Sequence, residues 1–108
     1  MPATYKVLGQ LEPAATTAST LYTVPSAKST IISTINVANT LTSPDTIRIA
    51  VRPAGAALED KHYIAYGVVV AAGSVFTMTI GITLATTDVV TVYSTTGGSA
   101  FNAFGSEF

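Results

Sequence analysis

The chain has 108 residues and a mass of 11.1 kDa, of which 48% are hydrophobic and 10% are charged, and its formal net charge is −1 at pH 7. This length accommodates one small domain, and the high apolar content excludes a disordered chain, which needs low hydrophobicity and high charge. The 5 basic residues leave no electrostatic footprint for a nucleic-acid backbone, and the absence of cysteine excludes a disulfide framework, a zinc ribbon and a thiol nucleophile.

Short strands separated by turns are predicted along the whole chain, because β-branched and aromatic residues are enriched between proline and glycine breaks. Pro13 ends the first strand, and the small residues of segment 14–19 are expected to form a loop or arm. Segment 56–61 is predicted to be one helical turn or a loop. The predicted strands cover residues 5–11, 20–24, 29–39, 46–52, 62–70, 75–84, 88–95 and 99–104.

Alternation of apolar and polar residues predicts which side chains point into the core. In segment 46–52 the isoleucines and Val51 are expected to point inward, whereas Arg48 and Arg52 point outward. Segment 29–39 places Ile31, Ile35 and Val37 on one face. Segment 75–84 has the clearest alternation and is expected to be one half-buried strand. The residues expected in the core are Ile47, Ile49, Phe76, Met78, Ile80 and Val92.

About eight short strands, with turns roughly every 8 to 12 residues and no convincing helix, predict an all-β fold. We expect an antiparallel β-sandwich of the jelly-roll or Ig-like type. The missing crossover helices exclude a parallel α/β architecture. One β-sandwich domain is therefore expected over residues 1–108, in which residues 1–19 form an N-terminal strand plus an arm.

The acidic residues and the single histidine do not predict a metal site. His62 has only Glu59 and Asp60 nearby, and these adjacent carboxylates cannot easily converge on one ion with it. We interpret His62 as a residue at the start of a strand. The carboxylates are interpreted as solubilising and turn-forming groups at turns and chain ends: Glu12, Asp45, Glu59, Asp60, Asp88 and Glu107.

No combination of residues in the sequence predicts a catalytic site, so we expect no enzyme, no catalytic residues and no cofactor. A serine–histidine–aspartate set can be written from Ser74 or Ser99 with His62 and Asp88, but no G-x-S-x-G elbow accompanies it. Segment 97–99 lacks the lysine and the helix of a phosphate loop, and it is interpreted as a hairpin turn.

Several exposed groups suggest binding rather than chemistry. Arg48 and Arg52 are expected to pair with acids of a partner subunit or of the same sheet. The tyrosines favour either a sugar-binding surface or core and interface packing, and they are Tyr22, Tyr63, Tyr66 and Tyr93. The aromatic C-terminal segment 101–108 is expected to be the last strand of the sandwich or to dock on a neighbour.

No targeting or membrane segment is expected. The first nine residues contain no apolar signal-peptide core, and the longest mostly apolar run, 63–73, is about half of a membrane span. We expect a protein made in a cytoplasm that contacts no membrane and no nucleic acid.

Five segments together resemble a recurring type of small structural protein from the virions of tailed bacteriophages, including phages of cyanobacteria and marine bacteria. The segments are 21–25, 47–57, 62–66, 84–93 and 101–107, and the similarity covers nearly the whole chain. The resemblance implies a β-sandwich module of a phage particle that decorates the capsid or sits on the tail or fibres. It transfers no catalytic residue.

We therefore expect a virion protein assembled in the host cytoplasm, first of all a capsid decoration, or cement, protein that contacts the major capsid protein. A tail, baseplate or fibre-attachment adaptor is the alternative, and a carbohydrate-binding receptor module is the third. Because the chain carries so few charged residues, we expect its surface to be partly buried in an assembly. A homotrimer is the first oligomeric state expected. The alternative is a neutral threonine-rich domain, which would have the same composition.

Overall fold

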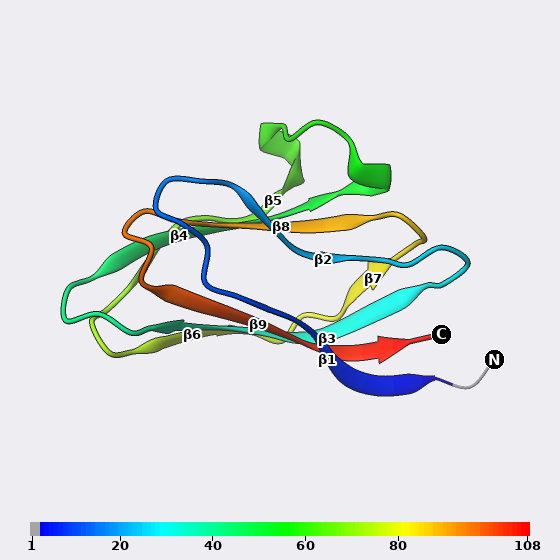
Figure 1. The fold of residues 1–108 in the computed structure, drawn as a ribbon, viewed down its shortest axis with the longest axis horizontal. Helices are drawn as coiled ribbons and strands as arrows, with labels where there is room; N and C mark the ends of the chain where they lie inside the picture. Colours follow the sequence, from blue (N-terminus) through cyan, green and yellow to red (C-terminus); the bar gives the residue numbers. More distant parts are fainter. Residues whose placement is uncertain (1–2) are drawn as a thin grey trace.

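The computed structural model describes residues 3–108, which form nine β-strands and two short 3-10 turns (Figure 1). The strands are β1 (Thr4–Leu11), β2 (Ser19–Thr23), β3 (Thr30–Asn39), β4 (Asp45–Arg52), β5 (Tyr63–Val70), β6 (Val75–Met78), β7 (Ile82–Leu84), β8 (Val89–Ser94) and β9 (Ser99–Glu107). The turns are η1 (Pro53–Gly55) and η2 (Asp60–His62), and η2 falls in the segment predicted as a helical turn or loop. No helix in the described part of the chain is long and apolar enough to cross a membrane.

The strands form two antiparallel sheets that lie face to face (Figure 1). Sheet A has the order β1-β9-β3-β6, with β7 also paired to β3, and sheet B has the order β2-β8-β4-β5. The prediction of an all-β antiparallel sandwich is therefore confirmed.

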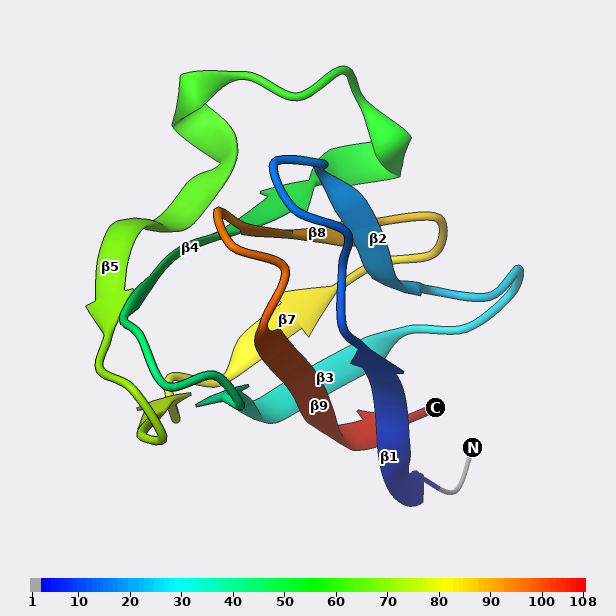
Figure 2. The same ribbon diagram turned by 60° about the vertical axis from the view of Figure 1, so that its left-hand side comes forward.

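The strand pairs are nested, which selects the jelly roll from the two sandwich types expected. Strand β1 pairs with β9, β2 with β8, β3 with β6 and β7, and β4 with β5. This nesting is the pattern of a jelly roll, in which one long antiparallel hairpin is rolled up. The pairing of β3 with β9 and of β4 with β8 then completes the two sheets. Figure 2 shows β1, β9 and β3 lying side by side in sheet A.

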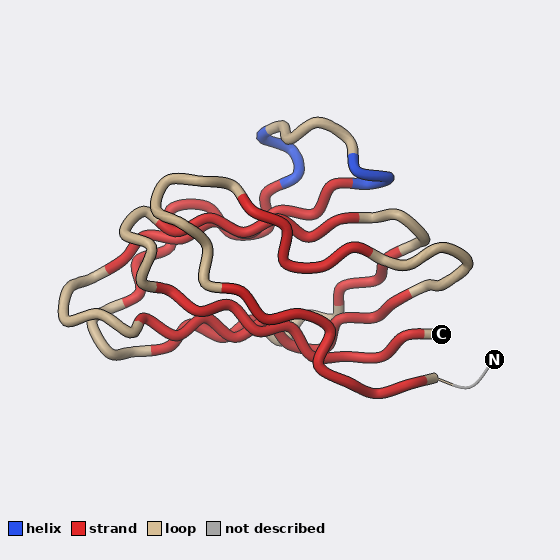
Figure 3. The backbone as a smooth tube through the Cα atoms, viewed as in Figure 1, coloured by secondary structure: helices blue, strands red, loops and turns tan. Residues whose placement is uncertain are grey.

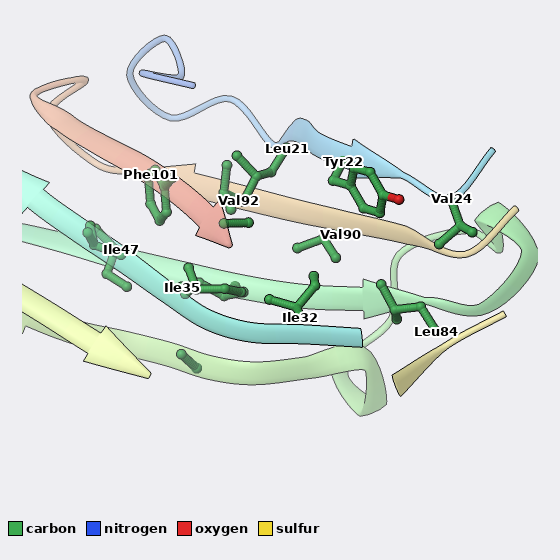
Figure 4. Packing of buried hydrophobic residues seen from close by; sticks show 14 of the residues in the cluster. Leu21, Tyr22, Val24, Ile32, Ile35, Ile47, Leu84, Val90, Val92 and Phe101 are labelled. Carbon is green, nitrogen blue, oxygen red and sulfur yellow. The ribbon is translucent and has the colours of Figure 1, made fainter. Parts of the chain in front are cut away.

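The core lies between the sheets and consists mostly of aliphatic side chains, together with Phe101 and Tyr22 (Figure 4). Ile47, Ile49 and Val92 are fully buried there, as predicted. Phe76 and Met78 are only partly buried, because β6 lies at the edge of sheet A and packs against the core from its margin.

The prediction that Ile80 belongs to the core is wrong. Segment 75–84 is not one strand: β6 ends at Met78, β7 begins at Ile82, and Gly81 between them has a φ of 67°. This left-handed conformation turns the chain out of the sheet and leaves Ile80 60% exposed.

A bulge also corrects the predicted face of β3. The register against β9 shifts between Ile32 and Thr34, so one residue is inserted and the alternation reverses. As a result Ile32 is fully buried and Ile31 faces outward, although Ile35 and Val37 are buried as predicted.

The last strand is longer than predicted and lies inside sheet A, between β1 and β3. It continues through Gly105 to Glu107, so the C-terminal segment forms a central strand of the sandwich. The N-terminal segment forms edge strand β1 followed by a loop that crosses to sheet B, where the Thr16 backbone N–H donates to the Ser94 carbonyl at 2.9 Å.

Most connections lie at the two ends of the sandwich, but the connection between β4 and β5 is different. Figure 3 shows that it carries both 3-10 turns and stands away from the core, on the outer side of sheet B. Arg52 holds it there, because its side chain donates to the carbonyls of Gly55 and Ala56 and to the Thr91 hydroxyl.

Candidate functional site

The histidine expected at the start of a strand lies in η2, directly before β5. The side chain of His62 is buried, and its Nδ1 accepts a hydrogen bond from the Glu59 backbone N–H at 3.0 Å. This is a turn-closing role. In residues 3–108, no three histidine, aspartate or glutamate side chains lie where they could hold a metal ion together.

The members of the serine–histidine–aspartate set are engaged in separate interactions. The Asp88 carboxylate accepts hydrogen bonds from the backbone N–H groups of Ala54 and Ala85, at 2.9 and 2.8 Å. The Ser99 hydroxyl donates to a different carboxylate, and Ser74 lies in the turn before β6. The structure does not bring these residues together as a site.

Two of the carboxylates interpreted as solubilising groups are buried, which corrects that interpretation. Asp45 begins β4 and accepts hydrogen bonds from the hydroxyls of Ser94 and Ser99 and from the backbone N–H groups of Thr46 and Thr96. Burial alone would raise the pKa of Asp45, but these hydrogen bonds outweigh it and hold the pKa below its ordinary value.

The other buried carboxylate is Glu107, at the opposite end of β9. Its carboxylate accepts a hydrogen bond from the Tyr22 hydroxyl at 2.6 Å and forms an ion pair with Lys6 Nζ at 2.9 Å. These two contacts lower the pKa of Glu107, whereas burial followed by the Glu107 contact raises the pKa of Tyr22 to about 12. Tyr22 also bonds Thr30, so it belongs to the interior and not to any sugar-binding surface.

Three further tyrosines, Tyr63, Tyr66 and Tyr93, form a group with one arginine on the outer face of sheet B. The Arg48 guanidinium lies 4.5 Å from the ring centroid of Tyr66 and 4.3 Å from that of Tyr93. Tyr63 and Tyr66 meet edge to face with centroids 4.8 Å apart. We call these four residues the tyrosine–arginine cluster. Within the described residues no acid of the same sheet pairs with Arg48 or Arg52, because the one ion pair there joins Lys6 and Glu107. Pairing with acids of a partner subunit stays a prediction.

Two bulges in β5 create this cluster. Tyr63 and Tyr66 are three residues apart, so regular alternation would place them on opposite faces of the sheet. The register against β4 shifts on both sides of Ala65, and Gly67 has a φ of 69°. Tyr63, Tyr66 and Val69 therefore all face outward. No pattern in the sequence marks these bulges except the lone glycine within the strand.

A hollow of about 420 Å³ opens beside the cluster and is lined by Asp60, Tyr63 and Tyr66. Asp60 belongs to η2 of the raised β4–β5 connection and the two tyrosines belong to β5, so the hollow lies where that connection joins β5. The ring of Tyr66 is 60% exposed although Arg48 and Tyr63 hold it in place.

The outer face of sheet A differs in kind, because it carries no charged side chain among the described residues. Its five strands contain only two charged residues, Lys6 and Glu107, which pair with each other. Glu107 is buried, and Lys6 lies opposite Gly105, on the face that Glu107 shares, with its side chain 45% exposed at edge strand β1. One outward row of cross-strand neighbours is polar and uncharged: Gln10, Asn102, Asn36 and Thr77. Beside it lie four exposed apolar side chains, which we call the apolar patch: Tyr5, Val7, Ile31 and Phe104.

Comparison with known proteins gave no match: neither protein-family models, nor curated proteins, nor solved structures are similar to this chain at a significant level. The resemblance to small phage virion proteins therefore stays a prediction.

Proposed function

We propose that the protein is a structural virion protein that decorates a phage head, and that it docks on the capsid through the outer face of sheet A. The observation that carries the proposal is the uncharged character of that face. A free surface normally mixes charged groups with the rest, whereas the centre of a protein interface is depleted of them.

The side chains of this face suit a protein partner. Tyr5 is 84% exposed and Val7 is 50% exposed, and they lie next to Phe104, so the patch offers apolar area that binding would remove from water. The neighbouring amides bond each other across the strands: Gln10 donates to Asn102 at 2.8 Å. Such ordered polar groups favour a defined orientation of the partner.

The fold adds an argument by analogy. Jelly rolls recur in viral capsid and lectin domains, although a fold alone does not determine a function. A small sandwich in which most residues belong to paired strands is suited to a component that is present in many copies.

The small area of this face favours an oligomer, and a trimer is the oligomeric state that we propose first. Four strand positions about 4.8 Å apart and about eight residues long give this face roughly 500 Å². A specific interface needs about 800 Å² on each side. Several copies joined around a local three-fold axis of the head would supply that area together and cross the joints between capsid subunits.

The test uses two matched variants, each of which adds one lysine at an exposed valine of an edge strand. Val7→Lys places the charge on the proposed docking face, and Val69→Lys places it on the outer face of sheet B. Both are mixed with heads of the encoding phage that lack the protein, and bound copies are counted after sedimentation. We expect Val7→Lys to lose binding and Val69→Lys to bind like the wild type.

Quantitative mass spectrometry of complete particles provides the second measurement. A decoration protein should be present at copy numbers that scale with the capsid protein, and heads without it should release DNA at a lower temperature. A handful of copies per particle with unchanged head stability would instead identify a tail, baseplate or fibre adaptor. Equal binding by the two lysine variants would refute docking through sheet A.

A further inference from the structure

We infer that the hollow beside the tyrosine–arginine cluster is a binding site for an uncharged pyranose sugar of a cell-surface or capsular glycan. This inference does not depend on the proposed docking of sheet A. The two surfaces lie on opposite sides of the sandwich, so a copy docked through sheet A would present the hollow to the surroundings (Figure 1).

The aromatic platform is the first argument. Tyr66 is 60% exposed, yet its ring is held by the Arg48 guanidinium at 4.5 Å and by the Tyr63 ring at 4.8 Å. An exposed ring fixed in this way loses little conformational freedom when a ligand stacks on it. The apolar C–H face of a pyranose is flat and matches such a ring.

The polar groups around the platform suit hydroxyls. The Asp60 carboxylate accepts hydrogen bonds only, and it is not part of any ion pair among the described residues. The tyrosine hydroxyls can donate and accept. A sugar hydroxyl does both, so it can bridge a carboxylate and a neighbouring phenol.

Charge and size exclude other ligand classes. Arg48 disfavours a cation over the rings, while Asp60 disfavours an anion in the hollow. The volume of about 420 Å³ lies in the range of small-ligand sites, which combine apolar walls with a few polar groups. A proline-rich peptide would need an extended groove, which three lining residues do not form.

The experiment displays the protein as a streptavidin-bound tetramer on a printed array of bacterial and algal glycans, and each hit is titrated in solution by isothermal calorimetry. We expect binding to at least one neutral hexose glycan. Tyr66→Ala should weaken the affinity at least about tenfold, and Asp60→Asn should weaken it several-fold. Tyr66→Phe, which keeps the ring, should bind within about threefold of the wild type.

Tyr5→Ala is the matched control, because it removes an exposed tyrosine from the opposite sheet and should leave glycan binding unchanged. Chemical denaturation of Tyr66→Ala confirms that the variant is folded. Failure to bind any glycan, or equal binding by wild type and Tyr66→Ala, would overturn the inference. Binding of a polyproline decapeptide that depends on Tyr66 would replace the sugar with a peptide. Retained glycan binding by Val7→Lys would separate this site from the docking face of sheet A.

Discussion

Gly9 has no side chain, and this allows edge strand β1 of one sheet to lie close to edge strand β2 of the other. A Cβ atom placed at this position would lie 2.3 Å from the carbonyl oxygen of Leu21. Leu21 belongs to β2, so Gly9 is the point where edge strand β1 of sheet A approaches edge strand β2 of sheet B. The bulge between Val7 and Gly9 bends β1 toward that contact.

We predict that Gly9→Ala destabilises the protein by about 1 to 3 kcal/mol, the usual penalty for forcing an atom into a packed site. The backbone oxygen cannot move aside as a flexible side chain could, so β1 must shift away from β2. Denaturant unfolding followed by circular dichroism measures the change.

The control for this variant is Gly73→Asn. Gly73 has a φ of 64° and no atom within 4 Å of its missing Cβ, so only the backbone conformation matters there, and asparagine tolerates that conformation better than most residues. We expect a change below about 1 kcal/mol. Equal destabilisation by the two variants would contradict the steric explanation for Gly9.

At the scale of elements, the interruption between β6 and β7 decides which side chains of segment 75–84 support the core. Both strands pair with β3, but β6 pairs with the C-terminal half of β3, whereas β7 pairs with the first residues of β3. The intervening residues leave the sheet. Isoleucine at position 80 therefore contributes little apolar burial, whereas Ile35 of β3 is fully buried between the sheets.

Two alanine variants test this difference. Ile35→Ala should lower the free energy of unfolding by about 2 to 5 kcal/mol, because it leaves a cavity in the core. Ile80→Ala should change it by no more than about 0.5 kcal/mol, as for other surface positions. Urea unfolding midpoints of both variants provide the measurement. A large loss for Ile80→Ala would mean that segment 75–84 is one continuous strand after all.

At the scale of the whole molecule, two buried carboxylates join the sheets at opposite ends of β9. Asp45 of sheet B accepts from Ser99 at the start of β9, and Glu107 at the end of β9 accepts from Tyr22 of sheet B. An unpaired buried polar group costs free energy, so each network specifies how the sheets align. The central strand is thereby fixed at both ends.

The Tyr22–Glu107 contact predicts how stability depends on pH. The pKa of Tyr22 is raised from 10.0 to about 12, so the native state retains a proton that the unfolded state loses. The resulting stability, on the order of 2 kcal/mol, is complete below pH 10 and disappears as the pH rises toward 12. Glu107 has a lowered pKa, so its contribution is present above its ordinary value of 4.5 and is lost as the pH falls through the folded value.

Tyr22→Phe tests this dependence by urea unfolding at a series of pH values. The variant should be less stable than the wild type at pH 7, because Glu107 and Thr30 lose a partner, and the difference should shrink between pH 10 and 12. Tyr5→Phe removes a hydroxyl from an exposed ring and is the matched control. A difference that stays constant up to pH 12 would show that Tyr22 does not titrate as the structure implies.

Much of the architecture was determined by the sequence alone. Alternation of apolar residues and frequent turn signals specify the all-β class and the positions of most strands, because a half-buried strand needs period-two burial whatever its neighbours are. The predicted number of strands was one too low, because segment 75–84 forms two strands. This argument placed Ile47, Ile49 and Val92 in the core correctly. It also placed Arg48 outside, where the structure has it.

Only the tertiary structure decided where alternation fails. Bulges in β3 and β5 shift the register by one residue, and each shift moves the following side chains to the other face. This is why Tyr63 and Tyr66 meet on one surface. Ile80 leaves the core for a different reason: the chain leaves the sheet between β6 and β7, where Gly81 is left-handed, and it returns with Ile82 and Leu84 facing inward again. The burial of Asp45 and Glu107 has the same kind of origin, because their donors come from strands far apart in the chain. Pairing between distant segments is set by the rolled hairpin as a whole, and no local pattern encodes it.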